Sequence, residues 1–195
     1  YGFTAGRELT FNNIILNFNY TIEIENPTYT SDIGLFYING GKDASGVALT
    51  DDYGNFTFNN SAINMTNTGA TNRLHAIYYD SCGGTITLNN SQLNITDFPE
   101  DAIEWGGQAN SYLEIIDSTY TSDHNRGGII GTWNVTIDNS DVQVIDSTTS
   151  GSNGANFNIT DSTVDFSNNA SHGLSTGDLF ISNSTVTANN NAYMG

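Results

Sequence analysis

The chain has 195 residues, of which 21 are acidic and 4 are basic, so its formal net charge is −17. This balance argues against a nucleic-acid partner, because contacts with phosphates need clustered Lys and Arg. It also argues against binding to an anionic membrane surface. The sequence contains no run of about 18 apolar residues, the length that a membrane-spanning helix needs. The apolar fraction of 37% is large enough to build a buried core.

One eleven-residue phrase recurs along the chain, most clearly in residues 56–66. The residue that opens each copy is apolar, and so are the residues two and seven places later. This alternation within each half of the phrase predicts two short strands with one buried face. The spacing between copies shrinks to 22 residues, which predicts a minimal coil of about 22 residues with insertions in the N-terminal half. The copies begin at Leu9, Phe56, Ile86, Leu113, Val135, Phe157 and Leu179.

The alternation breaks between the two halves of each phrase, where every copy carries Asn or Asp. These residues tolerate the left-handed backbone conformation that a sharp corner requires. Stacked once per coil at a strand spacing of about 4.8 Å, their side chains predict an asparagine ladder. The members of this ladder are Asn13, Asn60, Asn90, Asp117, Asn139, Asp161 and Asn183.

A third and less regular apolar segment completes each turn. The whole pattern predicts an all-β fold, a parallel β-helix with three strands per coil, as one domain over residues 1–195. Residues 26–54 depart from the phrase and predict a long loop or an irregular coil. The third segments are residues 76–79, 102–105, 128–130 and 173–174.

The phrases at 127–130 with 135–140, and at 179–187, resemble the repeats of right-handed parallel β-helix proteins. Such repeats occur in bacterial and archaeal surface adhesins, in polymorphic outer-membrane proteins of the chlamydial type and in pectate-lyase-like enzymes. The resemblance covers most of residues 9–195 and implies the fold, which carries many unrelated functions. It also implies an extracellular or cell-surface location, with which the recurring Asn-x-Ser/Thr glycosylation sequences agree.

The insertions, which fall between one phrase and the next, hold most of the candidate functional residues, because loops on a rigid scaffold usually carry function. Stacking places equivalent positions of successive coils about 5 Å apart. Paired carboxylates with an assisting histidine could supply acid–base catalysis on a polysaccharide; these catalytic candidates are Asp80, Asp101, Glu104 and His124. Aromatic and polar side chains could bind a glycan; these candidates are Arg73, His75, Tyr78, Tyr79, Trp105 and Arg126.

Three interpretations of this group stay open: a solvated ridge of paired charges, a glycan-binding surface and a carbohydrate-active enzyme, either hydrolase or lyase. Residues 100–103 and 172–173 resemble fragments of polygalacturonase motifs, but three coils separate them and the Arg-x-Lys element of that family is missing. The acidic chain would repel an anionic substrate, so a neutral glycan fits better. The favoured function is an extracellular structural or adhesive β-helix, a cell-surface spacer or filament element.

The sequence predicts no cofactor, although calcium is the cation that clustered carboxylates would bind. The candidate ligands are Asp51, Asp52 and Glu100. No amphipathic capping helix is predicted at either end of the repeat, and an uncovered terminal coil exposes backbone groups and core. The expected partners are therefore a second copy stacked end to end or flanking domains of the same chain.

Overall fold

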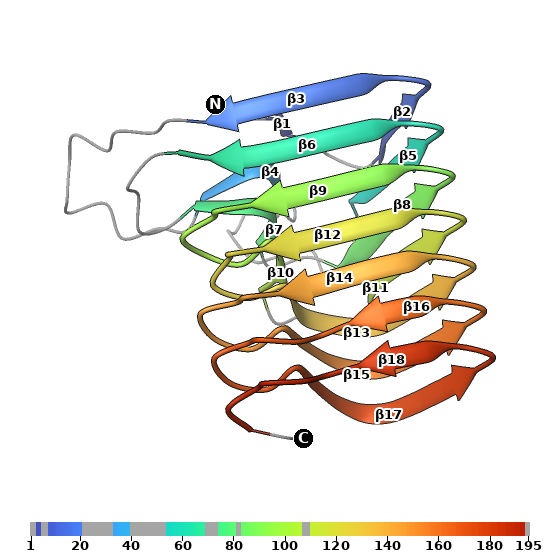
Figure 1. The fold of residues 1–195 in the computed structure, drawn as a ribbon. Helices are drawn as coiled ribbons and strands as arrows, with labels where there is room; N and C mark the ends of the chain where they lie inside the picture. Colours follow the sequence, from blue (N-terminus) through green and yellow to red (C-terminus); the bar gives the residue numbers. More distant parts are fainter. Residues whose placement is uncertain are drawn as a thin grey trace, which may run out of the picture.

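The computed structural model of the chain is an all-β solenoid in which the described elements are strands (Figure 1). The structure describes residues 3–4, 8–20, 33–39, 54–68, 74–80, 83–106 and 110–193. Strands with the same place in successive coils pair in parallel, so each turn of the chain lies directly on the previous one. The predicted parallel β-helix is confirmed.

Each phrase contributes one strand to each of two sides of the solenoid (Figure 1). The first halves form β2 (Glu8–Asn12), β5 (Asn55–Asn59), β8 (Gly84–Asn89), β11 (Ser111–Ile116), β13 (Ile129–Asp138), β15 (Ser152–Thr160) and β17 (Leu174–Ser182). The second halves form a separate 7-stranded sheet of β3 (Ile15–Tyr20), β6 (Ala62–Asn67), β9 (Gln92–Thr96), β12 (Thr119–Asp123), β14 (Asp141–Ile145), β16 (Thr163–Asp165) and β18 (Thr185–Thr187). The third side holds β1 (Phe3–Thr4), β4 (Ile33–Asn39), β7 (Leu74–Asp80) and β10 (Ile103–Trp105).

The register of the strands is the one that the phrase predicts. Leu9 lies opposite Phe56, and Phe56 lies opposite Ile86. In the last coils Val135 lies opposite Phe157, and Phe157 opposite Leu179, which confirms the 22-residue spacing. The apolar columns therefore stack along the axis and form one continuous core.

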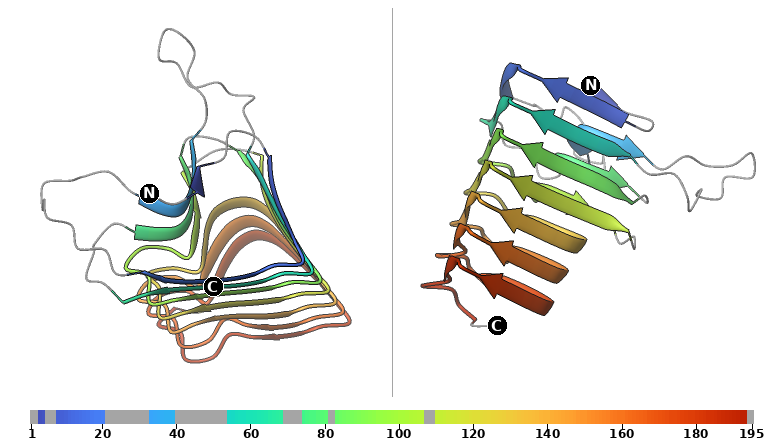
Figure 2. Two further views of the ribbon diagram at one scale, coloured as in Figure 1. Left: turned by 90° about the horizontal axis from the view of Figure 1, so that it is seen from above. Right: turned by 90° about the vertical axis from the view of Figure 1, so that its right-hand side faces the viewer.

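The third strand is separate only in the N-terminal coils. In the C-terminal coils it continues into the next phrase as one long strand, β13, β15 or β17, and these strands appear as nested arches when viewed from above (Figure 2). The register shifts between Ile130 and Thr132, where Gly131 adopts a φ of 75°. A side chain at Gly131 would collide with the carbonyl oxygen of Trp105, so glycine permits the bend.

The segment 26–54 contains a regular strand, which corrects the prediction of a loop or irregular coil for residues 33–39. Strand β4 pairs with β1 and β7 and buries Leu35, Phe36 and Ile38. It belongs to the third side of the first coil, so the phrase pattern does not mark it. Residues 26–32 and 40–53 lie outside the described residues.

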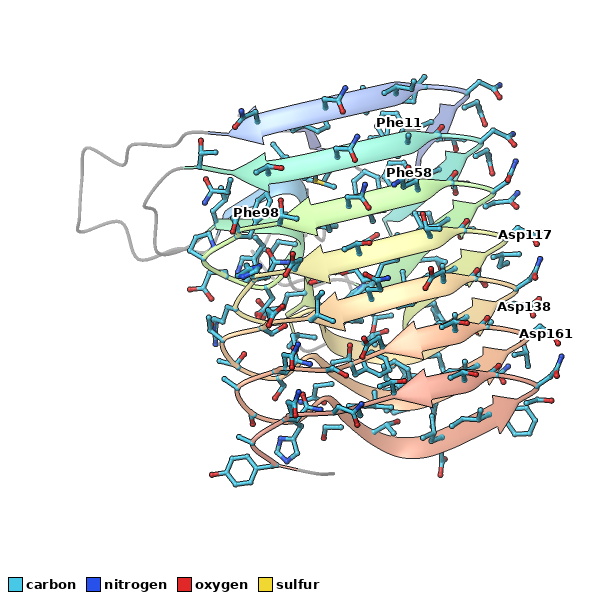
Figure 3. The ribbon with its side chains drawn as sticks, viewed as in Figure 1. Phe11, Phe58, Phe98, Asp117, Asp138 and Asp161 are labelled. Atoms are coloured by element: carbon cyan, nitrogen blue, oxygen red, sulfur yellow. The ribbon has the colours of Figure 1, made fainter. Side chains whose placement is uncertain are left out.

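The seven residues of the expected asparagine ladder lie at the first corner, where all have φ between 46° and 54°. Asn90 donates an amide hydrogen bond of 2.6 Å to Asn60, and Asn139 donates one of 2.6 Å to Asp117. Figure 3 shows Asp117, Asp138 and Asp161 along this edge of the solenoid. A serine ladder follows directly: each backbone N–H donates to the serine hydroxyl of the next coil, through Ser61, Ser91, Ser118, Ser140, Ser162 and Ser184.

The second corner carries another ladder, which the phrase pattern did not predict. Its first position has φ between 54° and 61° in Asp97, His124, Asp146, Asn168 and Asn190. In two of these coils the next position holds a buried amide, Asn125 or Asn169. Asn125 donates to the carbonyl oxygen of Ile95 at 3.0 Å and accepts from the N–H of Phe98 at 2.8 Å. These side chains replace the strand hydrogen bonds that the corner interrupts.

Candidate functional site

Neighbouring strands of the third side bring His75, Asp101 and Glu104 together. His75 lies on β7, and Glu104 lies on β10 opposite Tyr78. The N–H of Ile77 donates to the carbonyl oxygen of Ala102 at 3.0 Å, which places Asp101 beside His75. One ligand atom from each of the three side chains lies within 4.8 Å of the others. The structure thus brings together two of the four catalytic candidates, Asp101 and Glu104, with His75, which the sequence suggested as a glycan-binding residue; His124 lies in another group.

The imidazole of His75 is enclosed rather than displayed on the surface. Its exposed fraction is 1%, and its ring stacks on Tyr78 with centroids 4.7 Å apart. The Nδ1 atom lies 3.2 Å from Oε2 of Glu104, whose side chain is 26% exposed. His75 is therefore a buried component of the cluster, and Glu104 is its partly exposed neighbour.

Arg126 ties the next coil to this cluster through its guanidinium group. Nη1 of Arg126 is hydrogen bonded to Glu100 and lies 3.8 Å from Oδ2 of Asp101. The hydrogen bond to Glu100 is the main cause that raises the pKa of Arg126, so the guanidinium stays charged. Glu100, predicted as a calcium ligand, is thus an ion-pair partner of Arg126.

His124 belongs to a second group at the corner of the solenoid. Its Nδ1 atom lies 2.6 Å from Oδ1 of Asp123, and a carboxylate oxygen of Asp146 is close to both. The side chain of His124 is 63% exposed, and the backbone of this residue has a left-handed conformation at the corner, with φ of 54°. The structure thus places His124 in a group with Asp123 and Asp146.

Two predicted glycan-binding aromatics lie in the core, which corrects their assignment. Tyr79 and Trp105 have exposed fractions of 0% and 1%, and their rings stack on each other at 5.2 Å. A sugar cannot reach ring faces that are covered by neighbouring strands. Of the predicted aromatics, Tyr78 alone keeps partial exposure, and it packs on His75.

The remaining predicted residues fall outside the described part of the chain. Asp80 ends β7 in the backbone, but its side chain is not described. Arg73, Asp51 and Asp52 lie outside the described residues altogether.

The sequence reasoning missed the aromatic side chains that do reach the surface. Tyr112, Trp133 and Phe180 are 37%, 49% and 60% exposed. Tyr112 lies opposite Asn134, the residue after Trp133, and the N–H of Trp133 donates to Ser111 at 2.8 Å. For Phe180 the repeat indicated an exposed side chain, because this residue belongs to an outward-facing column of the phrase. In that column Phe180 lies opposite Asn158, which lies opposite Thr136.

Two shallow hollows lie beside Phe180 and Tyr112. One has a volume of about 280 Å³ and lies over β13, β15 and β17, with Asn134, Asn156 and Phe180 in its lining. The other, of about 340 Å³, is bordered by Thr85, Asn110 and Tyr112. Amide, hydroxyl and aromatic groups therefore share one face.

Comparison with models of protein families, with curated proteins and with solved structures finds no match. Within the described residues, no helix is long and apolar enough to cross a membrane. The fold and these side-chain groups are thus the basis for inferring function.

Proposed function

We propose that this chain is an extracellular structural β-helix, a cell-surface spacer or adhesive element that binds neutral glycans on one side face. The observation that carries the proposal is the placement of Tyr112 and Trp133, half exposed on adjacent strands. The hollow on this face is lined by the amides of Asn134 and Asn156 and also by the acidic Asp178. Such rings offer an apolar face to a sugar, while nearby amides and hydroxyls can hydrogen bond with its hydroxyl groups.

The rigidity of this face supports the proposal. The amide side chains of Asn134 and Asn156 lie 2.9 Å apart across β13 and β15. Both strands are fixed in register by their apolar columns, so the aromatic and amide groups are held in place before a ligand binds. A preorganised surface loses little conformational entropy on binding. The net charge of −17 favours neutral rather than anionic glycans.

The test is binding of the purified protein to an array of neutral oligosaccharides, followed by titration of each hit. Trp133→Ala and Tyr112→Ala should each weaken the interaction at least about tenfold, which equals 1.4 kcal/mol. Tyr193→Ala is the matched control, because Tyr193 is 63% exposed but lies in the last coil, outside this face. Absence of binding to every neutral glycan, or equal affinity of all variants, would refute the glycan-binding role.

A second observation favours a filament element. The core columns are covered in the inner coils, where Phe157 and Ile159 are 2% and 0% exposed, but Leu179 and Ile181 on β17 are 45% and 44% exposed. β17 and β18 are also the outermost strands on their side of the described stack. We propose that another coil packs on this surface and continues both sheets, supplied by a second copy stacked end to end or by a flanking part of the same chain.

Sedimentation velocity over a range of protein concentrations tests this stacking. The chain should form larger species as concentration rises, and more so at high salt, because salt screens the repulsion between acidic copies. Ile181→Asp should shift the equilibrium to single chains, whereas Thr121→Asp, on the outer face of β12, should not. A monomer at all concentrations and salt levels would overturn end-to-end association.

A further inference from the structure

We propose that His75, Asp101 and Glu104 form a binding site for a divalent transition-metal ion, with Zn²⁺ as the best match. The three side chains offer one imidazole nitrogen and two carboxylate oxygens. This mixture of nitrogen and oxygen donors is typical of sites for zinc and its neighbours in the first transition row. The inference does not depend on glycan binding or on end-to-end stacking.

The distances agree with donors that share one ion. Zinc binds imidazole nitrogen and carboxylate oxygen at about 2.0 to 2.2 Å in a tetrahedral arrangement, which places neighbouring donors roughly 3.3 Å apart. Nδ1 of His75 and Oε2 of Glu104 are 3.2 Å apart. Asp101 has a carboxylate oxygen within 4.8 Å of both, and this oxygen would move closer to them on binding the ion.

The surroundings also suit a bound cation. The side chain of Asp101 is 5% exposed, and His75 is 1% exposed, so two of the three ligands are held by packing. Gly127 lies next to Asp101 in the following coil, and a β-carbon there would be 2.5 Å from Oδ1 of Asp101. The absence of a side chain at Gly127 leaves room around this carboxylate. The partial exposure of Glu104 gives an ion or a water molecule an entry side.

The donor set favours a transition metal over calcium. Calcium is a hard cation that takes six to eight oxygen ligands, and an imidazole is a poor donor for it. His75, fixed by its stacking on Tyr78, would instead direct a nitrogen at a borderline ion such as Zn²⁺. With three protein ligands, a fourth position would stay open for water.

The test is metal binding by the intact chain after treatment with EDTA. Isothermal titration with ZnCl₂ should give one ion per chain at the site, and Co²⁺ should give a visible absorption band from the same ligands. His75→Ala and Glu104→Gln should each weaken binding at least about 100-fold, since even the loss of a residue that only hydrogen bonds to a metal ligand costs about 10- to 100-fold. Circular dichroism in EDTA checks that each variant is folded, and Glu104→Gln keeps the test valid if His75→Ala disturbs the core.

His124→Ala is the matched control, because His124 belongs to the separate and exposed group with Asp123 and Asp146. It should leave the zinc affinity of the His75 site unchanged. Lack of stoichiometric zinc binding would overturn the proposal. Binding that survives Glu104→Gln, or that disappears in His124→Ala, would also overturn it.

Discussion

Replacement of Asn169 by Ala is expected to lower the free energy of unfolding by about 3 to 6 kcal/mol. Asn169 is 1% exposed and satisfies three backbone groups at the second corner. Its Oδ1 accepts from the N–H of Ser147 at 3.0 Å, and its Nδ2 donates to the carbonyl oxygens of Val144 and Phe166 at 3.2 and 2.9 Å. Each buried group left without a partner costs about 1 to 2 kcal/mol, which gives the expected total.

Urea unfolding followed by circular dichroism measures this loss, with Asn158→Ala as the control. Asn158 lies on the exposed side of β15, so its replacement should change stability by less than about 0.5 kcal/mol. The converse substitution is Ser147→Asn. Ser147 occupies the same ladder position one coil earlier, and its buried Oγ has no hydrogen-bond partner among the described residues. An amide there should add about 1 kcal/mol. Equal stability of Asn169→Ala and Asn158→Ala would refute the role assigned to the second ladder.

Three other substitutions test the core, the first corner and the alkaline limit of the fold. Ile159→Ala should lower the free energy of unfolding in urea by about 2 to 5 kcal/mol, because Ile159 is fully buried. Thr136→Ala should lower it far less, because Thr136 faces outward. Equal urea midpoints for the two variants would contradict the strand register. Asn139→Val should cost about 1 to 3 kcal/mol and more than Asn134→Val, because φ at Asn139 is 46° and a β-branched residue resists this conformation. Burial raises the pKa of the Tyr120 hydroxyl above its usual value near 10, so the free energy of unfolding falls as pH rises through and beyond 10. The Tyr120→Phe variant should therefore lose less stability than the unchanged protein between pH 9 and pH 11. Identical losses in the two proteins would disprove this cause.

The repeat could be predicted from the sequence because two physical signals coincide in each copy. Apolar residues at alternate positions specify which face of a strand is buried, and an Asn or Asp marks where the direction changes. The alignment of Val135, Phe157 and Leu179 that the repeat predicts is the one found in the strand register. The second ladder has a similar pattern, in which a residue with positive φ precedes the amides Asn125 and Asn169. This pattern recurs regularly only in the later coils, so it is harder to recognise in the sequence.

The third side was harder to predict because its strands do not alternate clearly. Leu74, His75, Ala76 and Ile77 are consecutive and all buried, so no parity rule separates inward from outward side chains in β7. This explains why Tyr79 was expected at the surface. In β13 the merged strand bends at Gly131, and a single glycine in a sequence does not distinguish a loop from a bent strand.

The ladders also determine where function can reside on this solenoid. At the first corner every coil must present an Asn or Asp with left-handed φ, and a serine hydroxyl must meet the N–H of the neighbouring coil. An insertion there would break both ladders, so it would cost several hydrogen bonds at once. The connections of the third side carry no such requirement, and the 47-, 30- and 27-residue spacings of the early coils all arise there. It is on this side that His75, Asp101 and Glu104 converge. A site could thus be built there without disturbing the stacked core.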